Sequence, residues 1–168
     1  MKFLKLEKGA FSFHISERER RALFKLLELY PLVPASYQKL SRDGGKPEDQ
    51  QLLEDALNSQ RNEHKAQVLA MLQTKSRFQS APGGYQFNLK PTEAEWLLQV
   101  LNDIRVGSWL LLGSPDSMVK IFGALNDKSL PHFWSMEASG DFQMTLVHAL
   151  TGGGGTPPPS TETGEAIM

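Results

Sequence analysis

The sequence predicts an α+β fold: a mainly helical single domain at 1–150, with a small three-stranded antiparallel sheet and five or six helices packed around it. Short segments that alternate apolar and polar residues indicate half-buried strands. Longer segments with apolar residues every three or four positions indicate amphipathic helices. The chain has 168 residues, 40% of them hydrophobic and 22% charged, which is typical of one globular domain with a substantial core.

One strand-to-helix pattern occurs twice, in units at 2–30 and 85–112. The aligned parts, 11–27 and 85–101, match without a gap at a constant offset of 74 residues. They share four identities: Phe13/Phe87, Glu19/Glu93, Leu23/Leu97 and Leu27/Leu101. A duplication and convergent patterning both explain the match, and either one supports the same pair of structural units.

The first unit begins with a predicted hairpin. Strands at 2–6 and 10–15 are joined across 7–9, where Gly9 can adopt the positive φ that a tight turn needs. A third strand at 85–89 follows a turn rich in proline and glycine. Pairing this strand with the hairpin completes the sheet, because two strands alone are marginally stable in water.

The first helix is predicted to begin at Ser16 and to end at Tyr30. Ser16 and Glu19 have the spacing of a capping box, and Pro31 cannot continue the helix. The core face of this helix carries Leu23, Leu26, Leu27 and Tyr30. We expect a loop at 31–47 to follow it.

A long helical stretch is predicted from Pro47 to Arg77. Acidic residues at its start and basic residues at its end suit the helix macrodipole. Both ends carry residues predicted to be in the core: Leu53, Ala56, Leu57, Val68, Leu69 and Leu72. The middle, 58–65, has no apolar residue, so the helix either breaks there or crosses solvent.

The helix of the second unit is predicted to begin at Pro91, because proline is tolerated in the first helical turn. Thr92 and Glu95 have the spacing of a second capping box. Gly113 marks the end of this helix, since glycine is favoured just past a helix C-terminus.

Three more helical segments are predicted at 114–125, 131–138 and 141–150, the last two separated near Gly140. The remaining segment, 151–168, is rich in glycine and proline and cannot bury a core, so it is predicted to be a disordered tail.

The charge balance argues against nucleic acid and membranes as partners. The chain has 18 basic and 19 acidic residues and a formal net charge of -1, so no global field attracts polyanions. The first 25 residues lean basic, which leaves nucleic-acid binding through the first helix as the least favoured alternative. The most apolar stretch, 96–112, is interrupted by polar and charged residues and is too polar for a membrane span.

Several kinds of chemistry find no support in the sequence. Cysteine is absent, which excludes disulfides and thiol nucleophiles and, with an N-terminus unlike a signal peptide, predicts a cytoplasmic protein. The histidines are scattered singly, so no metal site is predicted. No catalytic or cofactor-binding motif occurs, so we expect no cofactor and favour a protein that is not an enzyme.

The best polar candidate site is Asn102, Asp103 and Arg105, within an otherwise apolar helix. Asn102 and Arg105 are i,i+3 neighbours, and Asp103 lies about 100° round the helix from Asn102. Polar groups in such a place cost free energy unless they are paired. They therefore form structural hydrogen bonds to neighbouring loops or they line a binding site, and the structural alternative is favoured.

The same helix carries a candidate interface. Beyond Ile104 apolar residues cover more than one face of the helix, so this end lies at the centre of the domain or in an interface. The candidate interface residues are Trp96, Val106, Trp109 and Leu110.

The stretch 88–105 contains the pattern Glu-x-x-x-Leu-x-x-x-Leu-Asn-Asp-Ile-Arg, and 142–150 reads Phe-x-x-x-Leu-Val-x-Ala-Leu. The first resembles the central helix, and the second the terminal helix, of an uncharacterised bacterial family of mainly helical domains that is best populated in actinobacteria. The polar middle of the long helix and the glycine-proline tail depart from that family. The resemblance implies a mainly helical fold and, because the family's genes often lie beside a protease-adaptor gene, a role close to protein turnover.

Together these observations favour a non-enzymatic cytoplasmic interaction or regulatory protein that binds a protein partner or a second copy of itself. The alternative is a small-molecule binder or enzyme with its site around Asn102, Asp103 and Arg105.

Overall fold

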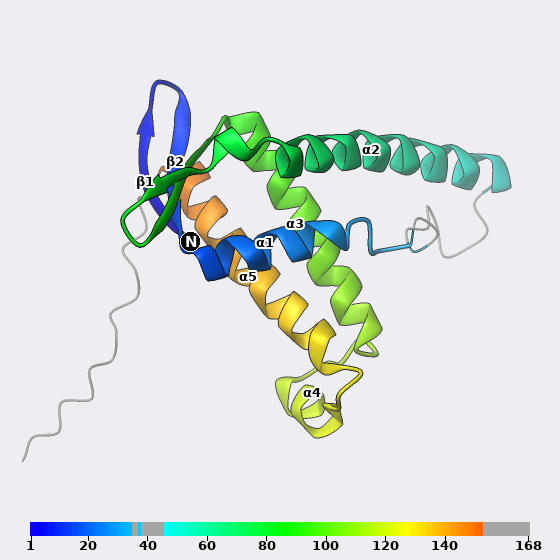
Figure 1. Cartoon of the computed structure of the whole chain (residues 1–168). Helices are drawn as coiled ribbons and strands as arrows, with labels where there is room; N and C mark the ends of the chain where they lie inside the picture. The colour runs from blue at the N-terminus through cyan, green and yellow to red at the C-terminus, as the bar shows by residue number, and fades with distance from the viewer. Residues whose placement is uncertain (35–36, 38–45, 153–168) are drawn as a thin grey trace, which may run out of the picture.

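A four-stranded antiparallel sheet and five α-helices make up the described part of the chain (Figure 1). The structure is a computed structural model, and it describes residues 1–34, 37 and 46–152. The α+β class and the mainly helical content are confirmed, while the sheet has four strands instead of the predicted three. In chain order the elements are β1 (Lys2–Glu7), β2 (Ala10–Ile15), α1 (Glu17–Glu28), α2 (Pro47–Gln73), the 3-10 turn Lys75–Arg77, β3 (Gln79–Ala81), β4 (Gly84–Leu89), α3 (Pro91–Leu111), α4 (Met118–Ala124) and α5 (Leu130–Leu150).

The additional strand is β3, at one edge of the sheet. The strand order is β1-β2-β4-β3, and each neighbouring pair is antiparallel. Sequence patterning misses β3 because Gln79 and Ser80 are polar and exposed, so the segment shows no apolar alternation. The strand forms because the turn at 82–83 folds it back onto β4, where Ala81 pairs with Gly84.

The two hairpins are related by the same offset of 74 residues as the strand-helix patterns. The first hairpin turns at 8–9 and the second at 82–83. In the middle of the sheet Phe13 pairs with its equivalent, Phe87, and the β2–β4 register runs symmetrically on either side of this pair. The β1-β2 and β3-β4 hairpins therefore meet about a local twofold axis between β2 and β4.

The helix of the first unit has the predicted capping box. The backbone N–H of Glu19 donates to Ser16 Oγ at 3.2 Å, and the backbone N–H of Ser16 donates to Glu19 Oε2 at 2.9 Å. The Glu19 carboxylate also pairs with the ammonium group of Met1. Glu19 thus stabilises the helix start and holds the beginning of β1 against it.

The helix of the second unit begins at Pro91, as predicted, but its capping residues differ from the predicted ones. The backbone N–H of Lys90 donates to the Glu93 carboxylate at 2.9 Å. The capping box predicted at Thr92 and Glu95 is wrong, because the helix already begins at Pro91 and its third residue is Glu93.

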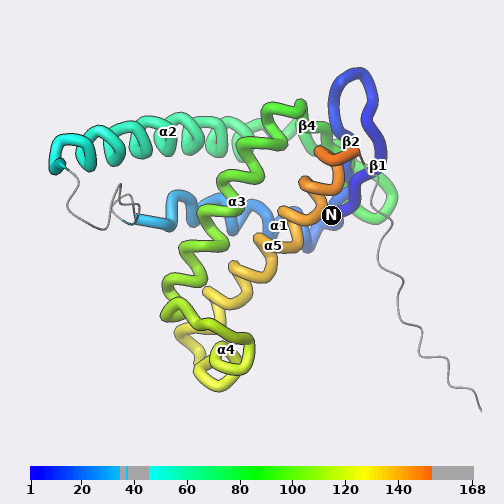
Figure 2. Tube along the Cα trace, turned by 180° about the vertical axis from the view of Figure 1, so that it is seen from behind, coloured from blue at the N-terminus to red at the C-terminus, as the bar shows by residue number. Residues whose placement is uncertain are grey.

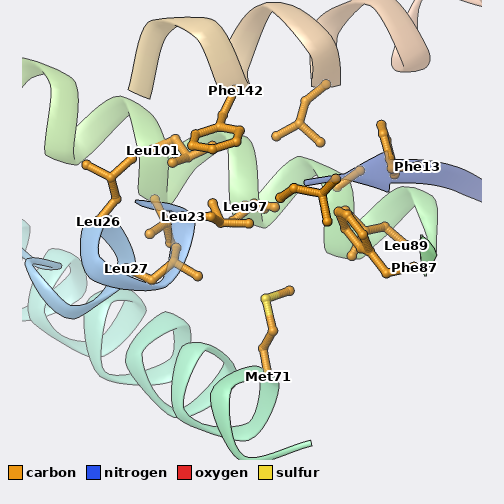
Figure 3. Close-up of a cluster of buried hydrophobic side chains, with 14 of the residues drawn as sticks. Phe13, Leu23, Leu26, Leu27, Met71, Phe87, Leu89, Leu97, Leu101 and Phe142 are labelled. Carbon is orange, nitrogen blue, oxygen red and sulfur yellow. The ribbon is translucent and has the colours of Figure 1, made fainter. Parts of the chain in front are cut away.

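The core lies between one face of the sheet and helices α1, α3 and α5 (Figure 3). The rings of Phe13 and Phe87 stack with their centroids 5.4 Å apart. Leu23 of α1 and Leu97 of α3, which are equivalent in the two units, are both fully buried. Burying a leucine contributes about 2 kcal/mol, so the repeated pattern supplies much of what holds the units together. All four residues of the predicted core face of the first helix are buried.

Helix α5 packs along α3 and is continuous, whereas the sequence predicts two segments that meet near Gly140. Glycine weakens an isolated helix. Here the buried side chains of Phe142 and Leu146 fix the helix against the core. At Gly140 a built Cβ makes only an ordinary contact, 3.9 Å from Arg105 Cδ, so glycine is not required there by the packing on α3.

Helix α2 runs unbroken for 27 residues, so of the two alternatives the helix continues through its polar middle. Its buried residues are Val68 and Met71, near its C-terminal end. Among the predicted core positions Ala56 and Leu69 are exposed. For Ala56, Figure 1 shows the reason, because the N-terminal end of α2 projects past α3 and has no sheet beneath it. Leu69 lies near the C-terminal end, about 100° round the helix from the buried Val68, and faces solvent.

Helix α4 is shorter than the predicted segment 114–125. The backbone N–H of Lys120 donates to Ser117 Oγ at 3.3 Å, so the N-cap is Ser117. After α5, Thr151 and Gly152 form a turn. The predicted tail from 153 onward lies outside the described residues, as does most of the predicted loop at 31–47.

Candidate functional site

The three residues of the predicted polar site do not converge on one point. Asp103 faces α2, and Arg105 is exposed beside α5. Asn102 lies between them and lines hollows on both sides of α3. Successive helical residues point about 100° apart, which is why neighbours in the sequence reach different partners here.

Asp103 is held by the chain that follows α1. Its Oδ1 accepts hydrogen bonds from the backbone N–H groups of Leu32 at 2.6 Å and Val33 at 3.2 Å. Its Oδ2 lies 3.4 Å from Nη2 of Arg61, which comes from the middle of α2. The Asp103 side chain is 14% exposed and that of Arg61 is 16% exposed. Asp103 therefore joins α1, α2 and α3 at one point.

The polar middle of α2 is explained by its contacts with α3. Besides the Arg61–Asp103 pair, Gln60 Nε2 donates to Gln99 Oε1 at 3.4 Å. The ring of His64 stacks on that of Trp96 with centroids 6.5 Å apart. This turn of α2 packs through polar and aromatic contacts, so it needs no apolar residue.

These contacts border a cleft of about 230 Å³ between α2, α3 and the end of α1. The residues that give it chemical character are Tyr30, Arg61, His64, Asn102, Asp103 and Val106. Burial and the negative charge of Asp103 raise the pKa of Tyr30, and the positive charge of Arg61 acts in the opposite direction. The Tyr30 phenol thus lies in the field of both charged groups.

A larger groove, of about 1050 Å³, runs between α3 and α5. Arg105 lines it from α3, and Met144 and Val147 line it from α5, both largely exposed. Gln143 Nε2 donates to Asn102 Oδ1 across the groove at 3.4 Å. The structure thus assigns Arg105 to this groove and Asp103 to the cleft.

The four predicted interface residues are half-buried and lie apart. Trp96 packs on His64, and Val106 lines the cleft. Trp109 donates from Nε1 to the backbone carbonyl of Pro115 at 3.0 Å and so anchors the connection between α3 and α4. Trp109 and its neighbour Leu110 therefore lie at the end of α3 that leads towards α4, whereas Trp96 and Val106 belong to the α2 side.

Large exposed apolar side chains gather instead around α4, in a region that we name the α4 tip. It consists of Leu111, Met118, Val119, Phe122, Leu130 and Trp134. Val119 is 81% exposed, Trp134 is 61% exposed and Phe122 is 59% exposed. The Phe133 ring contacts the rings of both Phe122 and Trp134, each with centroids 5.6 Å apart. Figure 2 shows α4 at the end of the α3–α5 pair that lies away from the sheet.

Sequence reasoning missed Arg61, His64 and the α4 tip. A signal for Arg61 and His64 was the polar turn of α2, whose polar residues match Gln99 and Asp103 on a neighbouring helix. The tip had no such signal, because the four large apolar residues of α4 suit a core as well as a surface, and only the structure shows that Ile121 alone among them is buried.

Two further searches concern the described residues alone. Within residues 1–34, 37 and 46–152, no three histidine or acidic side chains come together in a way that could hold a metal ion. In the same part of the chain, no helix combines the length and the apolar character that a membrane span requires.

A scan against protein-family models and searches of curated proteins and solved structures return no match to this chain. The relation to the actinobacterial family therefore stays a prediction from the sequence.

Proposed function

We propose that this chain is a non-enzymatic interaction or regulatory protein and that it binds a protein partner through the α4 tip. The observation that carries the proposal is the exposure of Val119, Phe122 and Trp134 on adjacent helices. Large apolar side chains exposed near one another often mark interaction surfaces, and tryptophan is enriched among residues that dominate binding energy. A cytoplasmic protein that acts close to protein turnover, as the family resemblance implies, would use such a surface to hold its partner.

The tip is also built to keep its shape without a partner. Ile121 and Phe133 are buried beneath it, and Trp109 fixes the connection that leads into α4. A rigid apolar surface loses little conformational entropy on binding, which favours affinity.

The test is capture of the partner by the intact protein and by variants that change the tip without disturbing the core. Val119→Ser and Trp134→Ala alter exposed side chains, so the fold should remain intact. Met144→Ser is the matched control, because Met144 is 73% exposed on α5 but lies outside the tip. Light scattering on the purified protein measures self-association alongside.

We expect a stoichiometric partner, or a second copy, to be retained by the wild type and the Met144→Ser variant and lost by the tip variants. Retention by every variant would show that the tip is not the binding surface. A monomer that captures nothing would reject the interaction function.

The second candidate, a small-molecule binder or enzyme around Asn102, Asp103 and Arg105, is supported in part by the cleft. Asn102 and Asp103 line it together with Arg61 and His64, whereas Arg105 does not. The cleft suits binding better than catalysis, because Asp103 is already engaged by two backbone N–H groups.

A further inference from the structure

The cleft between α2 and α3 contains a cationic side chain with unused hydrogen-bonding capacity. Within the described part of the chain, the Arg61 guanidinium makes one polar contact, from Nη2 to Asp103 Oδ2 at 3.4 Å. A guanidinium has five N–H donors, and an ideal charged contact of this type is about 2.7–2.9 Å long. Arg61 is thus a mostly buried cation whose N–H groups can donate further and shorter hydrogen bonds to a ligand.

Asp103 is in the opposite situation. Its Oδ1 takes two backbone hydrogen bonds, from Leu32 and Val33, and these hold the carboxylate in place without Arg61. An incoming anion can therefore bind Arg61 without displacing Asp103 from α1.

The walls of the cleft fit a ligand with a polar and an apolar end. Tyr30 and His64 lie next to each other, with ring centroids 6.3 Å apart, and supply polar edges. Val33, Leu57 and Val106 supply an apolar surface. The volume of about 230 Å³ is below the roughly 300–1,000 Å³ of pockets for drug-sized ligands, so the ligand is small.

We propose that this cleft binds a small monocarboxylate, with the carboxylate on Arg61 and the hydrocarbon part against Val33, Leu57 and Val106. The planar guanidinium matches the geometry of a carboxylate and can donate two parallel hydrogen bonds to it. This site is independent of the α4 tip, so either proposal can fail without the other.

The test is titration of the full-length protein with benzoate and with benzamide, followed by NMR signals of the His64 ring and by calorimetry. The two probes have the same ring, and only benzoate carries the charge. We expect benzoate to bind in the millimolar range, about tenfold or more tighter than benzamide, and to shift the His64 signals. Acetate and formate serve as smaller carboxylate probes.

Three variants locate the site. Arg61→Gln removes the guanidinium group that would bind the carboxylate. Val106→Phe fills the cleft and leaves the Arg61–Asp103 pair in place, so at least one of these two variants should fold. Each is expected to weaken benzoate binding about tenfold or more. Arg105→Gln removes a cation of the neighbouring groove and is expected to leave binding unchanged.

Equal affinity for benzoate and benzamide would overturn the proposal, as would the absence of any response to all three carboxylates at millimolar concentrations. Loss of binding in Arg105→Gln, with binding retained in Arg61→Gln, would also overturn it and would place the anion in the α3–α5 groove.

Discussion

The two strand-helix units share a hairpin, a helix start and a core face, and they differ in how far their helices continue. Helix α1 has 12 residues, and helix α3 has 21. At the common offset Asp103 corresponds to Leu29, the residue that follows α1, and Arg105 corresponds to Pro31. The second unit thus carries charged helical residues at the positions where the helix of the first unit has already ended.

Because of this difference, the part that the two units share builds the core, and the part found only in the second unit carries candidate functional residues. The shared part buries leucines and phenylalanines and forms the sheet. The extension of α3 beyond the shared part carries the polar contact with α2 and leads to the α4 tip. Residues that match between the units therefore report on the core, and residues that differ are the ones to test for binding.

The largest loss of stability is expected from a substitution at Gly84, a position in the sheet where the two units differ. Gly84 corresponds to Ala10, yet a Cβ built at Gly84 lies 2.2 Å from the backbone oxygen of Ile15. Gly84→Ala forces the backbones of β2 and β4 apart, and we expect it to lower the free energy of unfolding by about 3 kcal/mol or more, measured by urea denaturation.

The control for this prediction is Gly123→Ala in α4, where a built Cβ meets no atom within 4 Å. Alanine there should leave the stability unchanged or raise it by up to about 1 kcal/mol. If both variants have the same stability, the close approach at Gly84 does not constrain the sheet.

The next effect concerns the charged residue that the first unit lacks. Asp103→Ala removes the acceptor for two backbone N–H groups and leaves Arg61 unpaired. We expect a loss of about 2 kcal/mol in the free energy of unfolding. Asp141→Ala, on the exposed side of α5, serves as a control and should change stability by less than about 0.5 kcal/mol. An equally small loss for Asp103→Ala would mean that α2 is held by other contacts.

A smaller loss of stability is expected from a substitution of Glu93, which is equivalent to Glu19 in the first unit. Arg77 Nη1 and Nη2 each lie 2.9 Å from an oxygen of Glu93, and both side chains are 26% exposed. We expect Glu93→Gln to cost about 1 kcal/mol at neutral pH, since partial exposure weakens the pair.

The pH dependence of the Glu93→Gln effect follows from the pKa. The Arg77 guanidinium lowers the pKa of Glu93 from its ordinary value of 4.5. The stability from this pair is present at pH values above 4.5 and is lost as the pH falls through the lowered pKa of the folded state. The difference between wild type and variant should therefore shrink in acid, as measured by thermal unfolding at several pH values. A constant difference would assign the effect to something other than the charge.

The last prediction, whose effect is no larger than that at Glu93, compares the two hairpin turns directly. Gly9 has a φ of 75° and Gly83 a φ of 80°, and no atom lies closer than 3.8 Å to a Cβ built at either residue. Gly9→Ala and Gly83→Ala should each cost about 1 kcal/mol, the penalty for an L-residue in this conformation. A much larger loss at one turn, in the same denaturation experiment, would show that the hairpins are not energetically equivalent.

The parts of the fold that depend on local sequence could be predicted. Ser16 and Glu19 form their capping box within four residues of chain, and the core face of α1 follows from helical spacing alone. The second cap was misplaced because threonine is a favoured N-cap residue and lysine is not, while the start of α3 is set by the end of β4. β3 was missed because its pairing depends on β4 and not on its own composition.

The candidate site could be predicted only in part. Asp103 attracts notice as a charge in an apolar helix, but its partner Arg61 is 42 residues away in the sequence. Only the topology brings the two together. The α4 tip could not be predicted from patterning, because large apolar residues such as Phe122 and Trp134 are usual in cores, and only the packing of the described residues shows that both are exposed.

Helix α2 has a consequence for how the cleft exchanges its contents. Over 27 residues it buries two side chains, and both lie near its C-terminal end. Regions with few buried contacts open by local unfolding at a far lower free energy than the whole protein. Amide hydrogen exchange should therefore be fast in the first half of α2 and slow in β2 and β4. When the opening extends past the middle of α2 as far as Arg61, this residue leaves Asp103, so a ligand can enter or leave the cleft while the sheet stays folded.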